Sequence, residues 1–273
     1  MPITTINGVG LFWERRGEQG APLVLVHGSW GDHHNWDAVV PGLARTFRVF
    51  TYDRRGHSQS ERLPTQGRIE EDVADLAAFI TTNRLAPAHV AGNSFGAAVT
   101  LKLAASQPDL FASATAHEPP LIGMLGDHPA LPVVRERIGA VLKTLRSGDL
   151  ETGAREFVEN VALGPGMWDQ LPPEMRQTFV LNAPTWLDEM NEPESVMVVD
   201  LVRLPAFSQP LLITRGDQSP PFFYAILDKI AAAVPHVQQY TFSGAGHVPH
   251  LTHADEYIRI VTDFVQHGRL AAV

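Results

Sequence analysis

Ser94 carries the strongest sequence signal for chemistry, because it is the central residue of the pentapeptide from Gly92 to Gly96, Gly-Asn-Ser-Phe-Gly. In a Gly-x-Ser-x-Gly pattern the serine sits on a sharp, strained turn between a strand and a helix, where larger neighbours than glycine would clash. Residues 88–91 favour a short buried strand before the turn, and residues 97–104 favour a helix after it. This context predicts that Ser94 is a nucleophile.

A serine hydroxyl attacks efficiently only when a base takes its proton, and histidine is the usual base. The chain offers 12 histidines, of which His247 lies in a glycine-rich segment between the last predicted strand and the last predicted helix. The adjacent His33 and His34 could suggest a metal site, but no carboxylate-rich cluster at ligand spacing accompanies them. We therefore expect a solvated loop or pocket rim there, and no metal.

The strands and helices that must position these residues alternate along the chain. Short apolar or β-branched runs alternate with helical patterns, which is typical of an α/β fold with a mostly parallel sheet covered by helices on both faces. Asn7-Gly8 predicts a hairpin turn between the first two strands. The predicted strands are 3–6, 11–16, 23–26, 48–52, 89–91, 112–116, 211–214 and 238–242, and the predicted helices are 36–45, 69–83, 95–106, 222–234 and 254–267.

The interval from 119 to 209 breaks this alternation, because it contains amphipathic helical patterns and prolines but no convincing strand. Its large apolar side chains are too many for a disordered linker. We predict a core domain formed by residues 1–118 and 210–273, with residues 119–209 inserted as a helical cap.

With these motifs in place, the chain resembles the α/β-hydrolase superfamily from about Ile3 to the last helix. The stretch Val26-His27-Gly28 is similar to that family's oxyanion loop, and residues 52–58 are similar to its D-x-x-G-x-S turn. The resemblance implies an eight-stranded sheet and makes His247 the base. It also implies that the backbone amides of Ser29 and Phe95 stabilise the oxyanion, with Trp30 as the alternative to Ser29.

The third member of a serine triad is a carboxylate that orients the histidine. The family usually carries this acid as G-x-x-D after the seventh strand, but here Ser219 occupies the position and Asp217 comes two residues early. Glu118, in Ala116-His117-Glu118-Pro119-Pro120, follows the sixth strand and resembles the acid of the zearalenone-lactone hydrolase branch. We predict Glu118 as the acid and keep Asp217 as the alternative.

The predicted cap and the loop after the third strand supply apolar side chains around the nucleophile. We expect Trp30, Trp168, Trp186 and Met190 to contact substrate, although helical aromatics also pack a cap against its core. The predicted function is hydrolysis of a hydrophobic ester or lactone through an acyl-enzyme. A C–C bond hydrolase, a cofactor-free perhydrolase and a slow lactone receptor are the alternatives. The charged run Asp188, Glu189, Glu192 and Glu194 is predicted to be a solvated helix face or loop.

Composition narrows the possible partners. Of the 273 residues, 30 are Asp or Glu and 21 are Lys or Arg, and the resulting charge of −9 repels nucleic acid and anionic lipid. The chain has no cysteine, signal-peptide pattern or membrane-spanning apolar run. We expect a soluble cytoplasmic protein, a monomer or homodimer, that uses no cofactor.

Overall fold

The computed structural model describes residues 2–63, 67–193 and 196–270. All eight predicted strands are confirmed, and they form one sheet in the order β1-β2-β4-β3-β5-β6-β7-β8. The six strands β3 to β8 pair in parallel with their neighbours among one another, whereas β2 pairs antiparallel with both β1 and β4. The strands are β1 (Ile3–Ile6), β2 (Val9–Arg16), β3 (Pro22–Val26), β4 (Arg48–Tyr52), β5 (Ala88–Asn93), β6 (Phe111–His117), β7 (Leu211–Gly216) and β8 (Gln238–Phe242).

Asn7 and Gly8 form the predicted hairpin turn between β1 and β2. Their φ angles are 49° and 80°, the left-handed conformations that a two-residue hairpin turn requires of both central residues. Ile6 consequently pairs with Val9, which fixes the register of the two strands.

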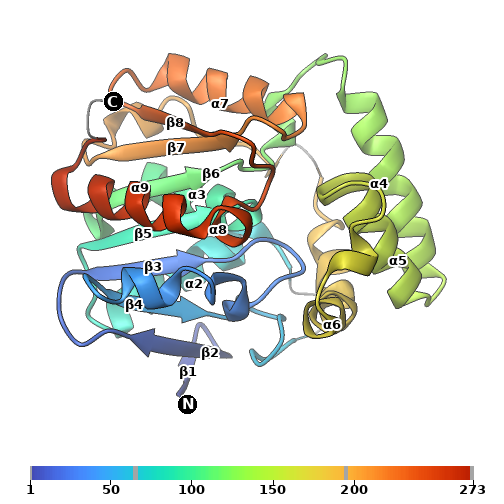
Figure 1. The fold of residues 1–273 in the computed structure, drawn as a ribbon, viewed down its shortest axis with the longest axis horizontal. Coiled ribbons are helices and arrows are strands. Elements are labelled where there is room, and N and C mark those ends of the chain that lie inside the picture. Colours follow the sequence, from blue (N-terminus) through green and yellow to red (C-terminus); the bar gives the residue numbers. More distant parts are fainter. Residues whose placement is uncertain (1, 64–66, 194–195, 271–273) are drawn as a thin grey trace.

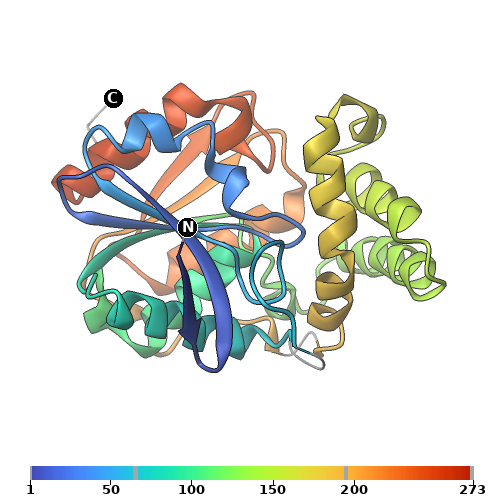
Figure 2. The same cartoon turned by 90° about the horizontal axis from the view of Figure 1, so that it is seen from below.

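Helices cover both faces of the sheet, because alternate residues of the inner strands point into different cores. Val24 and Val26 of β3 pack with α2 (Ile69–Thr82), α3 (Phe95–Ser106) and α7 (Pro221–Ala233). Leu23 and Leu25 pack instead with α1 (Val40–Leu43) and α9 (Ala254–His267). Figure 2 shows the sheet between these two layers.

The helix predicted over 36–45 is shorter than expected. A 3₁₀ turn, η1 (His33–Trp36), precedes α1, which has Pro41 in its first turn. Proline is favoured in the first turn of a helix but cannot donate the backbone hydrogen bond needed in a helix interior. The segment therefore forms two short helices instead of one. Over the three described ranges, we find no helix with both the length and the apolar character needed to cross a bilayer.

Within the segment predicted as a cap, the helices of residues 131–189 lie beyond the carboxyl ends of the parallel strands (Figure 1), whereas Met197, Val199, Leu204 and Phe207 near its end pack in the core with α3. Its described part, residues 119–193 and 196–209, contains helices and no strand. The side chains of the larger helices form a separate apolar cluster, to which Trp30 contributes from the loop after β3. The helices and turns are η3 (Ile122–Met124), α4 (Leu131–Arg146), α5 (Leu150–Phe157), the π-helix η4 (Val158–Ala162), η5 (Trp168–Gln170), α6 (Pro173–Glu189) and η7 (Leu204–Ala206).

Candidate active site

Ser94 lies on the strained turn that its pentapeptide predicts. Its φ and ψ angles are 55° and −123°, between the end of β5 and the first residue of α3. Side chains at the flanking glycines would collide with backbone: a Cβ on Gly92 would lie 2.3 Å from the carbonyl oxygen of Gly96, and one on Gly96 would lie 2.1 Å from that of Val26. The two glycines therefore allow β5, α3 and the end of β3 to approach closely enough to form this turn.

The loop after β3 lies directly against Ser94. A Cβ on Gly28 would be 2.9 Å from the Cβ and 3.5 Å from the Oγ of Ser94. His27 braces this loop, since its Nδ1 lies 2.7 Å from the carbonyl oxygen of Gly28 and its Nε2 accepts the amide proton of Arg54 at 2.9 Å. Ser29, the next residue, is half-buried beside this site.

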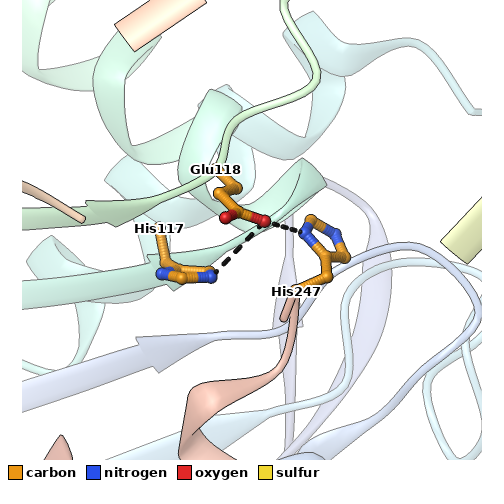
Figure 3. A group of neighbouring side chains, drawn as sticks. All are labelled: His117, Glu118 and His247. Atoms are coloured by element: carbon orange, nitrogen blue, oxygen red, sulfur yellow. Dashed lines mark hydrogen bonds and ion pairs between the residues drawn. The ribbon is translucent and has the colours of Figure 1, made fainter. Parts of the chain in front are cut away.

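His247 and Glu118 meet at the same edge of the sheet. Nδ1 of His247 lies 2.6 Å from Oε2 of Glu118, and Oε1 of Glu118 accepts the amide proton of Gly216 at 2.8 Å (Figure 3). Glu118 directly follows β6, and Gly216 ends β7. The side chain of Glu118 is fully buried, so these two bonds fix the orientation of a carboxylate that water does not reach.

The electrostatics of this pair favour an ionised carboxylate. Burial by itself would raise the pKa of Glu118, but the neighbouring His117 and the bond to His247 outweigh burial and lower the pKa to about 2. His117 is buried too, and burial is the main cause that lowers its pKa to about 4. Above about pH 4 His117 is therefore neutral beside the ionised Glu118, with 3.6 Å between Nε2 and Oε2. Below that pH His117 is protonated, and its charge then helps to hold the pKa of Glu118 down.

Two contacts hold His247 near the nucleophile. Nδ2 of Asn93, the residue before Ser94, donates to the carbonyl oxygen of His247 at 3.0 Å. The ring of Phe223 stacks on the imidazole with ring centroids 4.7 Å apart and planes 18° from parallel. The histidine is thus fixed through its backbone on one side and its ring face on the other.

Asp217, the alternative acid, lies in a different environment. Its carboxylate is exposed and accepts hydrogen bonds from the amide of Gly244 at 2.8 Å and from the hydroxyl of Ser243 at 3.2 Å. These contacts brace the turn after β8.

Among the residues that the structure describes, two groups of side chains have donor atoms close enough to hold a metal ion. One is His117, Glu118 and His247, and the other is Asp32, His33 and Asp53. In the second group, Nδ1 of His33 lies 2.6 Å from Oδ1 of Asp53, and although burial opposes it, this carboxylate raises the pKa of His33. This hydrogen bond satisfies the imidazole of His33 and the carboxylate of Asp53 without a metal ion.

The expectation for the two adjacent histidines was half wrong. His34 is exposed, but His33 is buried because Asp53 is brought to it from the turn after β4. A carboxylate 20 residues away cannot be paired with His33 from spacing alone.

The predicted substrate contacts gather in the apolar cluster of the cap. Trp30, Trp168 and Trp186 are buried, and Met190 is half-buried. The Trp30 ring lies 5.0 Å from that of Trp186 between ring centroids, so these indoles also join the cap to the loop after β3. Their contact with a substrate stays a prediction.

A mostly apolar cavity of about 240 Å³ lies between α4 and the start of α7. Phe222 forms part of its wall, and the adjacent Phe223 stacks on His247. The other lining residues are Ala130, Val133, Val134, Arg137, Asn160, Val161, Pro220 and Pro221.

The prediction of a solvated charged run at the end of α6 is wrong. Glu189 is buried and accepts hydrogen bonds from Ser29 and Arg54, while Asp188 pairs with Arg62 and Glu192 accepts the amide proton of Ile69. Glu194 lies outside the described residues. The available signal was the spacing of Asn182, Thr185 and Glu189, which places three polar residues on the helix face that also carries buried Trp186.

Comparisons with known proteins agree with this architecture. Zearalenone hydrolase of Bionectria ochroleuca is 27% identical over 273 residues, covering 97% of each chain. The 2-hydroxymuconate semialdehyde hydrolase of Pseudomonas sp. (strain CF600) is 25% identical and covers 93% of this chain and 90% of its own. A shorter match is 40% identical over 109 residues to the dihydrolipoyllysine-residue acetyltransferase component of the acetoin cleaving system of Pseudomonas putida. It covers 40% of this chain and 30% of that protein.

The fold is also that of a solved enzyme. The crystal structure of the enol-lactonase from Burkholderia xenovorans LB400 superposes with a TM-score of 0.81 at 21% identity, covering 97% of this chain and 100% of the other. A family model described as the alpha/beta hydrolase family matches residues 23–260. The chain therefore belongs to the alpha/beta hydrolase family.

Proposed function

We propose that this protein is a serine hydrolase that cleaves a hydrophobic carboxylic ester or lactone, with Ser94, His247 and Glu118 as its triad. The observation that carries the proposal is the 2.6 Å contact between His247 Nδ1 and the buried carboxylate of Glu118, at the sheet edge where Ser94 occupies its strained turn. A buried anion on Nδ1 leaves Nε2 of the imidazole to act as the base, which is what activation of a serine requires.

In the proposed reaction, Oγ of Ser94 attacks the carbonyl carbon while Nε2 of His247 takes the hydroxyl proton. The carbonyl oxygen becomes an oxyanion, which the amides of Ser29 and Phe95 stabilise. His247 then returns the proton to the departing alkoxide. A water molecule, deprotonated by the same imidazole, then attacks the acyl-enzyme; as the bond from the acyl carbon to Oγ of Ser94 breaks, the imidazole returns the proton to Oγ and the carboxylic acid is released.

The aromatic surroundings support a hydrophobic substrate. Trp30, Trp168, Trp186 and Met190 are the proposed apolar contacts, and the cavity beside Phe222 offers further apolar space near His247. The full-length relatives include an enzyme named for a lactone, zearalenone, which favours lactones and aryl esters as the first substrates to test.

The test is a panel of p-nitrophenyl esters and macrocyclic or aryl lactones, assayed with the native protein and with Ser94→Ala. We expect hydrolysis by the native protein and a loss of about 10⁴-fold or more in kcat for the variant. Equal, very slow turnover by both proteins would contradict the proposal and favour a lactone receptor.

C–C bond hydrolysis is the second candidate, because a full-length relative is a 2-hydroxymuconate semialdehyde hydrolase. Loss of absorbance by a ring-cleavage dienone product, dependent on Ser94, would favour it. Cofactor-free perhydrolysis would appear in the same ester assay as peracid formation with added hydrogen peroxide and acetate.

A further inference from the structure

The loop that follows β3 is strained. We define the oxyanion loop as residues 28–31, and within it Trp30 has a φ of 69°. A left-handed backbone is unfavourable for a large side chain, and such a conformation persists only where the surrounding structure holds it. The contacts that hold this loop therefore determine where its amides point.

Helix α6 of the cap supplies these contacts from one face. Asn182 Nδ2 donates to the carbonyl oxygens of Trp30 at 3.1 Å and Gly31 at 2.9 Å. One turn further, the Trp186 ring packs on the Trp30 ring. In the last turn, Glu189 Oε2 accepts the hydroxyl proton of Ser29 at 2.6 Å.

Glu189 reaches Ser29 from within a buried charge network. Oε1 of Glu189 accepts from Nη2 of Arg54 at 2.5 Å, and Arg54 makes two further bonds, each 3.0 Å long, to the carboxylate of Asp72 in α2. Nε2 of His57 lies 3.8 Å from the same Oε1. The side chains of Glu189, Arg54 and His57 are completely buried, so none of these groups can exchange its partner for water.

The same guanidinium also contacts the other side of the site. The carbon Cζ of Arg54 lies 4.3 Å from the ring centroid of Phe95, whose amide is the second proposed oxyanion donor. Arg54 thus touches Phe95 directly and touches Ser29 through Glu189.

We infer that Glu189 is a positioning residue of the proposed reaction: from the cap, it fixes the oxyanion loop through the hydroxyl of Ser29. This inference rests on the proposed function. The Ser29 hydroxyl is used for this contact, which leaves the Ser29 amide for the oxyanion. Packing of α6 against the core and formation of the oxyanion hole are then coupled, because Glu189, which contacts Ser29, belongs to α6.

A role confined to stability would lower the melting temperature and leave the turnover of folded enzyme unchanged. A positioning role predicts that Ser29→Ala, which removes one hydroxyl and keeps the amide, lowers turnover and leaves the melting temperature nearly unchanged. We expect kcat to fall roughly ten- to a hundredfold, the range for a misplaced catalytic donor, with KM changed by less than about twofold.

The experiment measures kcat, KM and melting temperature for Ser29→Ala, Glu189→Gln and the double variant. In Glu189→Gln the negative charge opposite Arg54 is lost, and an NH2 group placed toward Ser29 would reverse the hydrogen bond so that the hydroxyl accepts; because the native contact is not reproduced, Glu189→Gln should lose turnover as well. The double variant should be no slower than Glu189→Gln alone within about twofold, since both changes break one contact. The matched control is Asp188→Asn on the same helix, which breaks only the pair with Arg62 and should keep native kcat.

Native kcat in Ser29→Ala, or losses that multiply in the double variant, would overturn the inference. Amide hydrogen exchange provides a readout that needs no substrate: residues 28–31 should exchange faster in Ser29→Ala and Glu189→Gln than in the native protein and Asp188→Asn. Unchanged exchange would overturn it as well. Absence of Ser94-dependent hydrolysis in the native protein would instead refute the proposed function, and the exchange measurement would still decide the role of Glu189.

Discussion

Nδ1 of His247 lies 2.6 Å from Oε2 of Glu118, whereas the carboxylate of Asp217 is exposed and bonded to Ser243 and Gly244. The two carboxylates follow neighbouring strands, β6 and β7, yet only the first is buried against the imidazole. A carboxylate that water does not screen orients a histidine more strongly than one exposed to solvent.

The two acids give opposite predictions for paired substitutions. Glu118→Gln keeps the side-chain size but removes the anion that fixes the imidazole tautomer, so kcat for ester hydrolysis should fall by about 10⁴-fold. Asp217→Asn should change kcat by less than about threefold, because it alters only an exposed turn. Steady-state assays of both variants at pH 7.5 make the comparison, and the reverse ranking would make Asp217 the acid.

The sheet could be predicted well because each strand has a local signal. Apolar or β-branched residues mark all eight strands, and the ends of β1, β4 and β8 agree with the predicted bounds, while the other five strands extend one to three residues beyond them. The Ser94 turn could also be predicted, since its pentapeptide pattern lies within five consecutive residues, although the contact that requires Gly96 is with the distant carbonyl oxygen of Val26. These are features that a few consecutive residues determine.

The polar contacts between distant segments could not be predicted in this way. Ser29 and Glu189 are 160 residues apart, and His33 and Asp53 come from separate loops. An acidic residue at a helix end usually faces solvent, and nothing in its neighbours reveals that Arg54 will be buried opposite it. Tertiary packing, which brings buried charges together in pairs, decides these cases.

Replacing a tightly packed glycine and an unhindered glycine by alanine should change the stability of the protein in opposite directions. Gly92→Ala places a Cβ 2.3 Å from the Gly96 carbonyl oxygen, so the backbone must move, and we expect destabilisation of about 3 kcal/mol or more. Gly139→Ala lies inside α4 with nothing within 4 Å of its Cβ, and it should stabilise by about 0.5–1 kcal/mol. Urea unfolding followed by circular dichroism measures both, and equal midpoints would contradict the close packing around Ser94.

Buried neutral histidines predict that stability falls in mild acid. The pKa of His117 lies at about 4 in the folded protein, and burial also lowers the pKa values of His27, His57 and His250. Between pH 6.5 and 4 the unfolded chain therefore binds more protons than the folded one. From pH 7 to pH 5, His117 alone should lower the free energy of unfolding by about 2 kcal/mol.

One opposing contribution comes from His33, whose raised pKa adds stability below its unfolded value and loses it as the pH rises. The lowered pKa of Glu118 acts outside this window, since its stabilisation is lost only as the pH falls from about 4.5 towards 2. Urea titrations at pH 5 and 7 measure the free energy of unfolding, which we expect to be lower at pH 5. Equal free energies at the two pH values would contradict this prediction.

Substitution of His250 tests the contribution of one of these buried histidines by itself. Both its ring nitrogens are buried and have no hydrogen-bond partner in the described part of the chain, and its ring packs against Trp36 with centroids 4.6 Å apart. His250→Leu removes the unpaired polar atoms and the proton that the unfolded state binds, so it should stabilise the protein more at pH 5 than at pH 7. A variant whose stability depends on pH as strongly as the native protein's would show that His250 is not such a group.

Trapping the acyl-enzyme tests the central claim most directly. A p-nitrophenyl ester and a fluorophosphonate are each mixed with native protein, Ser94→Ala and Glu118→Gln, and intact mass and peptide mass spectrometry then locate the added group. Our account predicts one acyl or phosphonyl group on Ser94 of the native protein, slower labelling of Glu118→Gln and no labelling of Ser94→Ala. Modification of another residue, or hydrolysis by native protein that persists in Ser94→Ala, would contradict it.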